Sequence, residues 1–268
     1  MISRRPVARG RVVLMFQPAE EDDSGAKAVV ADPAYQEIQA YWAFAIHIES
    51  GRPFGYVSTC AGLINCASCG LRLSFMGKTA HAADPEDDVS PLLAIAELIP
   101  KLDALGQGGS LDDDFRLVTI TYVKIGEPSF GVAPSEGEIF ATSRTTDDAG
   151  METAARSLAI TAAERFGLSV DIEVCDSFAA SINDPDAYDM ATKAMDAIDA
   201  VYCDEGVPMR ASEDFGVFGW NAKAAMLCLG PGENYAALHN PDYDFPDDLI
   251  PIGSAIFERI ARSILGTA

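Results

Sequence analysis

The sequence is poor in basic residues and has no long apolar run. It holds 19 lysines and arginines against 41 aspartates and glutamates, a formal net charge of −22. The negative electrostatic field of such a chain repels nucleic acid and anionic membrane surfaces, so these partners are excluded and soluble cations are favoured. No apolar run reaches the roughly 18 residues that a membrane span requires, and the N-terminal region offers only residues 12–16 before polar residues follow. We therefore expect a protein without a signal peptide, located in the cytoplasm.

Cysteine is also sparse, with six residues in a chain of 268. Cys66 and Cys69 have the C-x-x-C spacing of zinc and redox motifs. A structural zinc site would need a second pair of ligands, and a redox motif normally opens a helix, whereas this pair leads into a strand-like run. We interpret the cysteines as small buried hydrophobic residues.

The middle of the chain has the clearest pattern of secondary structure. Alternating and helical apolar spacings predict, in order, a strand, a helix, two strands, a helix and a strand, at 70–77, 89–105, 115–125, 136–146, 151–166 and 168–178. The order β-α-β-β-α-β is that of the split βαβ, or ferredoxin-like, arrangement. We predict a compact inserted domain over residues 67–182.

The two flanking segments are predicted to form one further domain. Strands and helices alternate in them, with strands at 11–16, 41–48 and 224–230 and helices at 25–32, 185–198 and 250–265. This alternation favours an α/β fold with a parallel or mixed sheet. Neither flank has enough strands for a domain of its own. Residues 1–66 and 183–268 are therefore predicted to form one discontinuous α/β domain.

Several polar residues are candidates for a functional site. The stretch "FQPAEEDD", residues 16–23, places four carboxylates directly after a predicted strand. They could be solvated loop residues, or they could hold a cation and a base. The three histidines are His47 at the end of a predicted strand, where ligands gather in α/β sheets, and His81 and His239 in polar loops. Taken singly, each histidine is a weak signal, because a histidine at the end of a strand is more often a hydrogen-bonded core residue and one in a polar loop is usually solvated.

Taken together, these segments resemble the metallopeptidase superfamily of aminoacylases and carboxypeptidases. More narrowly, the chain is similar to its amidohydrolase branch, which includes hippurate hydrolases and indoleacetyl-amino-acid hydrolases. The resemblance covers almost the whole chain and rests on an ordered set of motifs: "FQPAEE", "AIHI" followed by "PFGYV", "GKTAHAADPEDDVSPLLA", "SEDFGVF" and "LHNPDYDFPDDLIPIG". It implies a di-metal α/β catalytic domain that carries an inserted lid, which usually forms a homodimer.

The resemblance also implies a reaction, the hydrolysis of amide bonds in N-acyl amino acids or small peptides by a metal-activated water. Glu20 corresponds to the general base. Glu21, His47 and His239 correspond to metal ligands, and their imidazole and carboxylate groups suit Zn or Mn. Asp22 and Asp23 are interpreted as solvated loop residues.

Further roles carry over to the inserted domain and to the "SEDF" segment. His81 corresponds to a lid residue that approaches the substrate, often across a dimer interface, where it stabilises the developing oxyanion. Arg144 corresponds to an arginine that pairs with a substrate carboxylate, although a solvated strand arginine explains it equally well. Glu213 and Asp214 are expected to shape the rim of the site or to cap a helix, without a catalytic role.

The sequence departs from the family pattern in two places. Gly131 stands where relatives carry an asparagine that is offered to the substrate. An upstream segment with a His-Asp-Gly-His-like motif, which supplies another histidine and a bridging ligand, has no counterpart here. With Glu21, His47 and His239 alone, one metal could be held but not two. The sequence thus leaves two hypotheses open: a metal-dependent amidohydrolase, or a non-catalytic fragment or pseudoenzyme that keeps the dimerising lid.

Overall fold

The computed structural model describes residues 2, 5–21, 24–147 and 150–268. The chain divides into two compact units. Unit 1 comprises residues 1–65 and 181–268, and unit 2 comprises residues 66–180. Unit 2 is therefore inserted into unit 1 in the sequence, close to the 67–182 span expected for an inserted domain.

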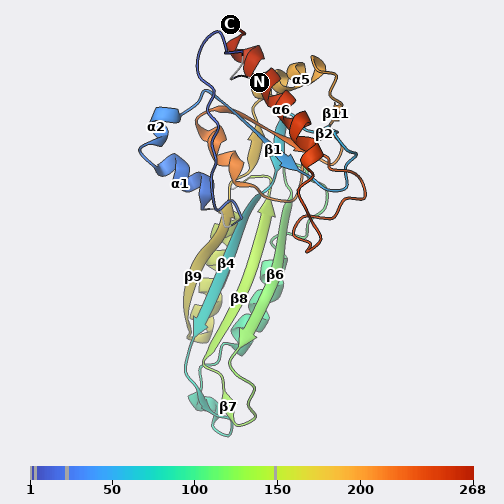
Figure 1. Ribbon diagram of the computed structural model, residues 1–268. Helices are drawn as coiled ribbons and strands as arrows, with labels where there is room; N and C mark the ends of the chain where they lie inside the picture. Colours follow the sequence, from blue (N-terminus) through green and yellow to red (C-terminus); the bar gives the residue numbers. More distant parts are fainter. Residues whose placement is uncertain (1, 3–4, 22–23, 148–149) are drawn as a thin grey trace. The chain divides into compact units, whose positions relative to one another are not determined.

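Unit 2 is built from one antiparallel sheet and two helices (Figure 1). Its main elements follow one another in the order β-α-β-β-α-β that the sequence pattern predicts: β4 (Ala67–Met76), α3 (Leu92–Asp103), β6 (Arg116–Ile125), β8 (Glu136–Thr145), α4 (Met151–Phe166) and β9 (Ser169–Phe178). The strand order across the sheet is β6-β8-β4-β9. A two-stranded ribbon of β5 (Ala80–His81) and β7 (Val132–Ala133), with the 3₁₀ turn η1 (Pro85–Asp87), completes the unit.

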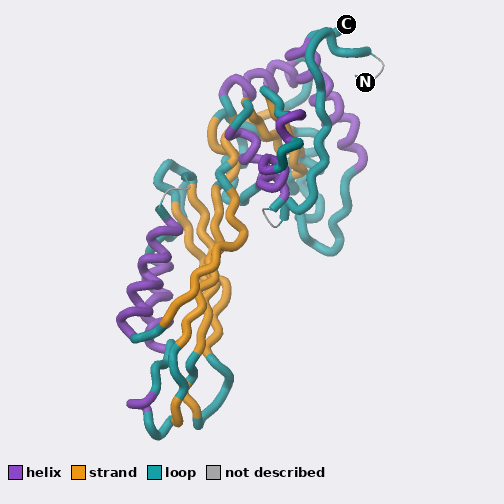
Figure 2. The backbone as a smooth tube through the Cα atoms, turned by 90° about the vertical axis from the view of Figure 1, so that its left-hand side faces the viewer, coloured by secondary structure: helices purple, strands orange, loops and turns teal. Residues whose placement is uncertain are grey.

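Both helices of unit 2 cover the same face of the sheet, as Figure 2 shows. Alternate side chains of β4, such as Leu71, Leu73 and Phe75, point to this face and are buried. They pack against apolar residues at helical spacing on α3 and α4, among them Ile95 and Ala159. The apolar residues whose alternating and helical spacing predicted these strands and helices therefore pack together in one core.

Unit 1 contains a four-stranded mixed sheet in the order β1-β12-β2-β11. Strands β1 (Trp42–Ile48) and β12 (Lys223–Leu229) are parallel, β12 and β2 (Val57–Ser58) are antiparallel, and β2 and β11 (Tyr202–Cys203) are parallel. A separate ribbon pairs β3 (Gly62–Asn65) with β10 (Ser181–Asn183). The helical elements are α1 (Gly25–Ala31), α2 (Tyr35–Ile38), α5 (Pro185–Asp196), α6 (Ile250–Leu265) and the 3₁₀ helices η2 (Asp214–Trp220) and η3 (Asp247–Leu249).

Strand β12 is buried on both faces, as expected of a central strand in an α/β sheet. On one face, Met226 and Cys228 pack with residues of α1 and η2, including Ala26 and Phe215. On the other face, Leu227 and Leu229 belong to the core formed with α5 and α6. The unit thus has helices on both sides of its sheet, with β1 at one edge.

One predicted strand is absent from the structure. Residues 11–16, "RVVLMF", form no strand and no helix. Leu14 and Phe16 are 78% and 91% exposed. The prediction was wrong because an apolar run favours a strand only where a neighbouring strand can pair with it, and this run makes no such pairing in unit 1.

No helix among the described residues is both long and apolar enough to cross a membrane.

Candidate active site

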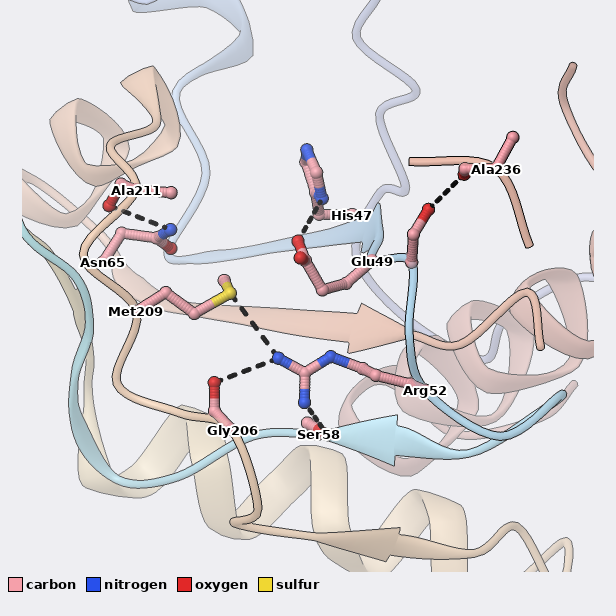
Figure 3. Close-up of polar contacts among 10 residues, drawn as sticks. His47, Glu49, Arg52, Ser58, Asn65, Gly206, Met209, Ala211 and Ala236 are labelled. Atoms are coloured by element: carbon pink, nitrogen blue, oxygen red, sulfur yellow. Dashed lines mark hydrogen bonds and ion pairs between the residues drawn. The ribbon is translucent and has the colours of Figure 1, made fainter. Parts of the chain in front are cut away.

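His47 lies near the C-terminal end of β1, at the same end of the sheet as the C-terminal end of β12. The two strands are parallel, and His47 is in register with Cys228. Its Nδ1 lies 3.7 Å from Oε2 of Glu49 (Figure 3). That distance exceeds a hydrogen bond, and among the described residues the buried Nδ1 has no hydrogen-bond partner. A buried imidazole nitrogen without a partner is available to a ligand.

The loop that carries Glu20 and Glu21 is held in place by Asp214, at the start of η2. Asp214 is 1% exposed. Its carboxylate accepts hydrogen bonds of 2.7 Å from Nε2 of Gln17 and from the backbone N–H of Ala26. The buried carboxylate therefore joins the loop at residues 17–21 to the first turn of α1.

Two backbone features keep this loop close to α1. Gly25 leaves no room for a side chain, because a Cβ there would lie 2.3 Å from the carbonyl oxygen of Pro18. Ala19, directly before Glu20, has a φ of 63°. This left-handed conformation costs a non-glycine residue about 1–2 kcal/mol. Strained positions of this kind gather at functional sites.

Glu20 lies in a cluster of carboxyl groups with Glu213 and Asp214. One ligand oxygen from each of the three residues lies within 4.8 Å of the others. Burial, and next the nearby charge and hydrogen bond of Glu20, raise the pKa of Glu213 to about 8. Burial is also the largest cause that raises the pKa of Glu20, and the charges of Glu21 and Asp214 act in the same direction.

The side chains of Glu20 and Glu213 are hydrogen-bonded to each other. Two carboxyl groups can form this bond only if one of them keeps its proton. Because burial and the neighbouring Glu20 raise the pKa of Glu213 to about 8, the pair shares one proton near neutral pH. The charge of His47 acts to lower the pKa of Glu20. Glu20 therefore belongs to a pair of carboxyl groups that shares one proton, an arrangement suited to proton transfer.

Glu21 and His239 form a second, more open pair. Oε2 of Glu21 lies 3.9 Å from Nε2 of His239, and the two side chains are 78% and 74% exposed. His239 lies in the loop between β12 and η3 and has a φ of 66°. The hydroxyl of Ser50, just beyond β1, donates a 2.7 Å hydrogen bond to the carbonyl of Ala236 in the same loop. The loop is thus fixed beside the end of β1.

The donor groups fit a divalent metal in their chemistry. Imidazole nitrogens and carboxylate oxygens are ligands that suit Zn and Mn, and Nδ1 of His47 makes no hydrogen bond within the described chain. Their arrangement is partial. Within the described residues, the group of three whose ligand atoms lie within 4.8 Å is Glu20, Glu213 and Asp214. Glu21 and His239 contribute a pair rather than a closed set of ligands.

The remaining predicted residues lie in unit 2, at opposite ends of its sheet. Arg144 on β8 is in register with Ser68, at the start of β4. Its guanidinium donates to Thr142 Oγ1 at 3.1 Å, and burial lowers its pKa. His81 is exposed, lies beyond the other end of β4, and its Nδ1 accepts a hydrogen bond from the backbone N–H of Ala83 at 3.1 Å. Asp22 and Asp23 lie outside the described residues.

A comparison with known protein families shows to which family the chain belongs. The model of peptidase family M20/M25/M40 matches residues 2–263. The chain belongs to this family. Its membership agrees with the ordered motifs around Glu20, His47 and His239.

Individual M20 relatives are similar over nearly all of the chain. "IAA-amino acid hydrolase ILR1-like 2" of Arabidopsis thaliana is 29% identical over 96% of this chain and 60% of the plant protein. Hippurate hydrolase of Campylobacter jejuni is 26% identical over 96% of this chain and 68% of that protein. The chain therefore spans about two thirds or less of the length of these curated relatives.

Solved structures confirm an α/β fold with mixed and antiparallel sheets. The Bacillus subtilis YXEP protein, described as a dinuclear metal binding peptidase of the M20 family, superposes with a TM-score of 0.73 at 20% identity, over 94% of this chain and 65% of that one. The aminobenzoyl-glutamate utilization protein of Klebsiella pneumoniae has a TM-score of 0.69 at 24% identity, over 93% of this chain and 60% of that one. At these identities the similarity concerns the fold.

The sequence of this M20 chain did not predict the contact between Glu213 and Glu20. Glu213 accepts a 3.4 Å hydrogen bond from the N–H of Phe215 and so caps η2, as expected. Its contact with Glu20 was not expected. An acidic pair before an aromatic residue is an ordinary helix start, so the only available signal was that "SEDF" is one of the family motifs.

Proposed function

We propose that this chain is a metal-dependent amidohydrolase of the M20 family that acts on N-acyl amino acids or small peptides. The observation that supports this most directly is the position of Glu20, hydrogen-bonded to Glu213 and close to His47. Hydrolysis of an amide needs a base that takes a proton from water and returns it to the leaving amine. Glu20 takes this role, and Glu213 orients its carboxylate.

In this proposal Glu21, His47 and His239 hold a Zn or Mn ion. The metal, when bound, would polarise the scissile carbonyl and make a water molecule more acidic. Unit 2 acts as a ferredoxin-like lid through which two copies dimerise. His81 stabilises the oxyanion, and Arg144 pairs with the carboxylate of the substrate. The names of the plant and Campylobacter relatives, an amino-acid conjugate hydrolase and a hippurate hydrolase, support this class of substrate.

The alternative is a protein of the same family that keeps the dimerising lid but does not catalyse. The exposed apolar run at residues 12–16 and the open Glu21–His239 pair favour it, because an active site normally holds its ligands in a closed, supported arrangement.

Metal analysis combined with a hydrolysis assay separates the two proposals. The protein is loaded with Zn or Mn, its bound metal is quantified, and N-benzoylglycine and N-acetyl amino acids are offered as substrates. Metal binding with release of free amino acid supports the amidohydrolase. Bound metal without turnover, or no bound metal, under conditions where a characterised hippurate hydrolase is active, supports the non-catalytic alternative.

A further inference from the structure

An open cavity in unit 1 is lined by none of the residues assigned to the proposed reaction. It lies between the turn at residues 52–56 and the loop that leads into α6, the dark red segment in Figure 1. Its volume is about 470 Å³, within the range of small-molecule sites in proteins. Buried Pro231 and Pro246 are among the residues that line it.

Three aromatic side chains line this cavity. Phe54 and Phe245 are 51% and 49% exposed, and Tyr235 is half-buried. The hydroxyl of Tyr235 donates a 2.8 Å hydrogen bond to the carbonyl of Asp244, and its ring meets that of Tyr243 edge-on at 6.0 Å. These contacts fix the ring of Tyr235 before any ligand arrives. Two exposed phenylalanines in one hollow are apolar surface that a ligand can cover.

The other lining residues give the cavity a strong negative charge. Asp244, Asp247 and Asp248 are exposed, and no lysine, arginine or histidine is among the described residues that line it. Arg52 is close in sequence to Phe54, but its guanidinium donates to the carbonyls of Glu205 and Gly206 (Figure 3 shows the latter contact). These bonds engage Arg52 with residues that do not line the cavity.

We propose that this cavity binds an organic cation, an alkylammonium or guanidinium group. Such a group uses both features of the lining, because its charge is attracted by the carboxylates while its carbon or planar surface lies against the aromatic rings. A neutral apolar ligand would bring the three aspartates out of water without compensation. A bare metal ion would leave the aromatic faces unused. The proposal does not depend on the amidohydrolase function and holds for an inactive protein as well.

An NMR titration of the ¹⁵N-labelled chain with tetramethylammonium tests the proposal. In about 150 mM NaCl, which screens the general negative field of the protein, we expect shifts centred on the amides of Tyr235 and Phe245. Phe245→Ala should weaken binding about fivefold, the loss expected for one cation–π contact at the strong end of the range for exposed sites. Asp248→Asn should weaken it by a smaller factor. Phe130→Ala and Asp171→Asn, two exposed positions in unit 2, should leave the affinity within about twofold.

Two further measurements keep the result interpretable. Phe245→Tyr keeps an aromatic face and should retain binding, so a loss confined to Phe245→Ala does not reflect misfolding. Acetyl-arginine amide serves as a second probe. If it binds more tightly than tetramethylammonium, the cavity is a site for a basic side chain; if it binds more weakly, the cavity is a site for free ammonium compounds. Equal binding of neutral tert-butyl alcohol, an unchanged affinity in Phe245→Ala, or diffuse shifts that vanish with salt would overturn the proposal.

Discussion

Glu20 and Glu213 share a hydrogen bond, and burial together with the neighbouring Glu20 raises the pKa of Glu213 to about 8. Glu20 approaches from the loop before α1, and Glu213 from the start of η2. Asp214, next to Glu213, joins the same loop to α1 through Gln17 and Ala26. The base of the proposed reaction is therefore positioned by two acidic residues that follow one another in the chain.

The stability of the metal-free protein should fall as the pH rises from about 5 to 8. In this window folded Glu213 keeps a proton that the unfolded chain, with an ordinary glutamate pKa of 4.5, has released. Stability falls wherever the folded state binds more protons than the unfolded state. A pKa raised from 4.5 to about 8 gives a loss on the order of 3–4 kcal/mol over this window, since one unit of pKa corresponds to about 1.4 kcal/mol.

Urea denaturation at pH 5, 6.5 and 8 measures this effect. Glu213→Gln keeps a hydrogen-bond donor without a titrating group, so its stability should change less across the same range. Glu86→Gln replaces an exposed glutamate in unit 2 and should follow the unsubstituted protein. If Glu213→Gln and Glu86→Gln gave the same pH dependence, the raised pKa of Glu213 would be wrong.

The limits of sequence reasoning are visible in these same residues. Glu20, Glu21 and His47 could be identified because each belongs to a local motif at the end of an apolar run. The contact between Glu20 and Glu213 could not, since it joins two loops that are distant in the sequence, and an acidic residue before a 3₁₀ turn has a sufficient local explanation as a cap.

The same distinction explains the fold. The elements of unit 2 were predicted well because each of its apolar stripes, such as that of α4, meets a sheet made from the neighbouring segments. The run at residues 11–16 has the composition of a strand but no pairing partner in unit 1. Composition reports the tendency to be buried, whereas pairing depends on which other segments are present.

Asp214 should be important for stability as well as for the site. Asp214→Ala removes the acceptor for the N–H of Ala26, a residue that is 0% exposed, and for the amide of Gln17. An unpaired buried donor costs about 1–3 kcal/mol, so we expect a loss of at least roughly that size. Chemical denaturation measures it. Asp171→Ala, on the exposed edge strand β9, should change stability by no more than about 0.5 kcal/mol; equal effects of both substitutions would contradict the role assigned to Asp214.

Substitutions at Glu20 and His239 should separate proton transfer from metal binding. In active, metal-loaded protein, Glu20→Gln should lower kcat by roughly 10² to 10⁴, the usual contribution of a general base, and leave the metal content unchanged. His239→Ala should reduce the bound metal itself, because it removes a ligand. Elemental analysis and a hydrolysis assay on the same samples give both quantities. Asp242→Asn alters an exposed carboxylate in the loop of His239 and should affect neither. Full activity with Gln at position 20 would exclude Glu20 as the base.

His81 and Arg144 should act on one substrate only when they come from two copies of the chain. Arg144 is in register with Ser68, and β4 continues to Met76 before the chain reaches His81. The eight steps of strand from Ser68 to Met76 place the two side chains roughly 26 Å or more apart within unit 2. This distance is greater than the length of one N-acyl amino acid. If both residues contact the substrate, as the proposed lid requires, each active site combines Arg144 of one copy with His81 of the partner subunit.

A mixture of two inactive variants tests this arrangement. His81→Ala and Arg144→Ala should each be strongly impaired. When they are mixed in equal amounts and allowed to exchange subunits, half of the dimers are mixed, and each mixed dimer has one intact site. Activity should therefore return to roughly a quarter of that of the unsubstituted protein, as expected for sites shared across a two-fold axis. Mixing His81→Ala with itself, under the same exchange conditions, should restore nothing. If the two variants did not complement each other although mixed dimers formed, the two residues would not serve the same site from different copies.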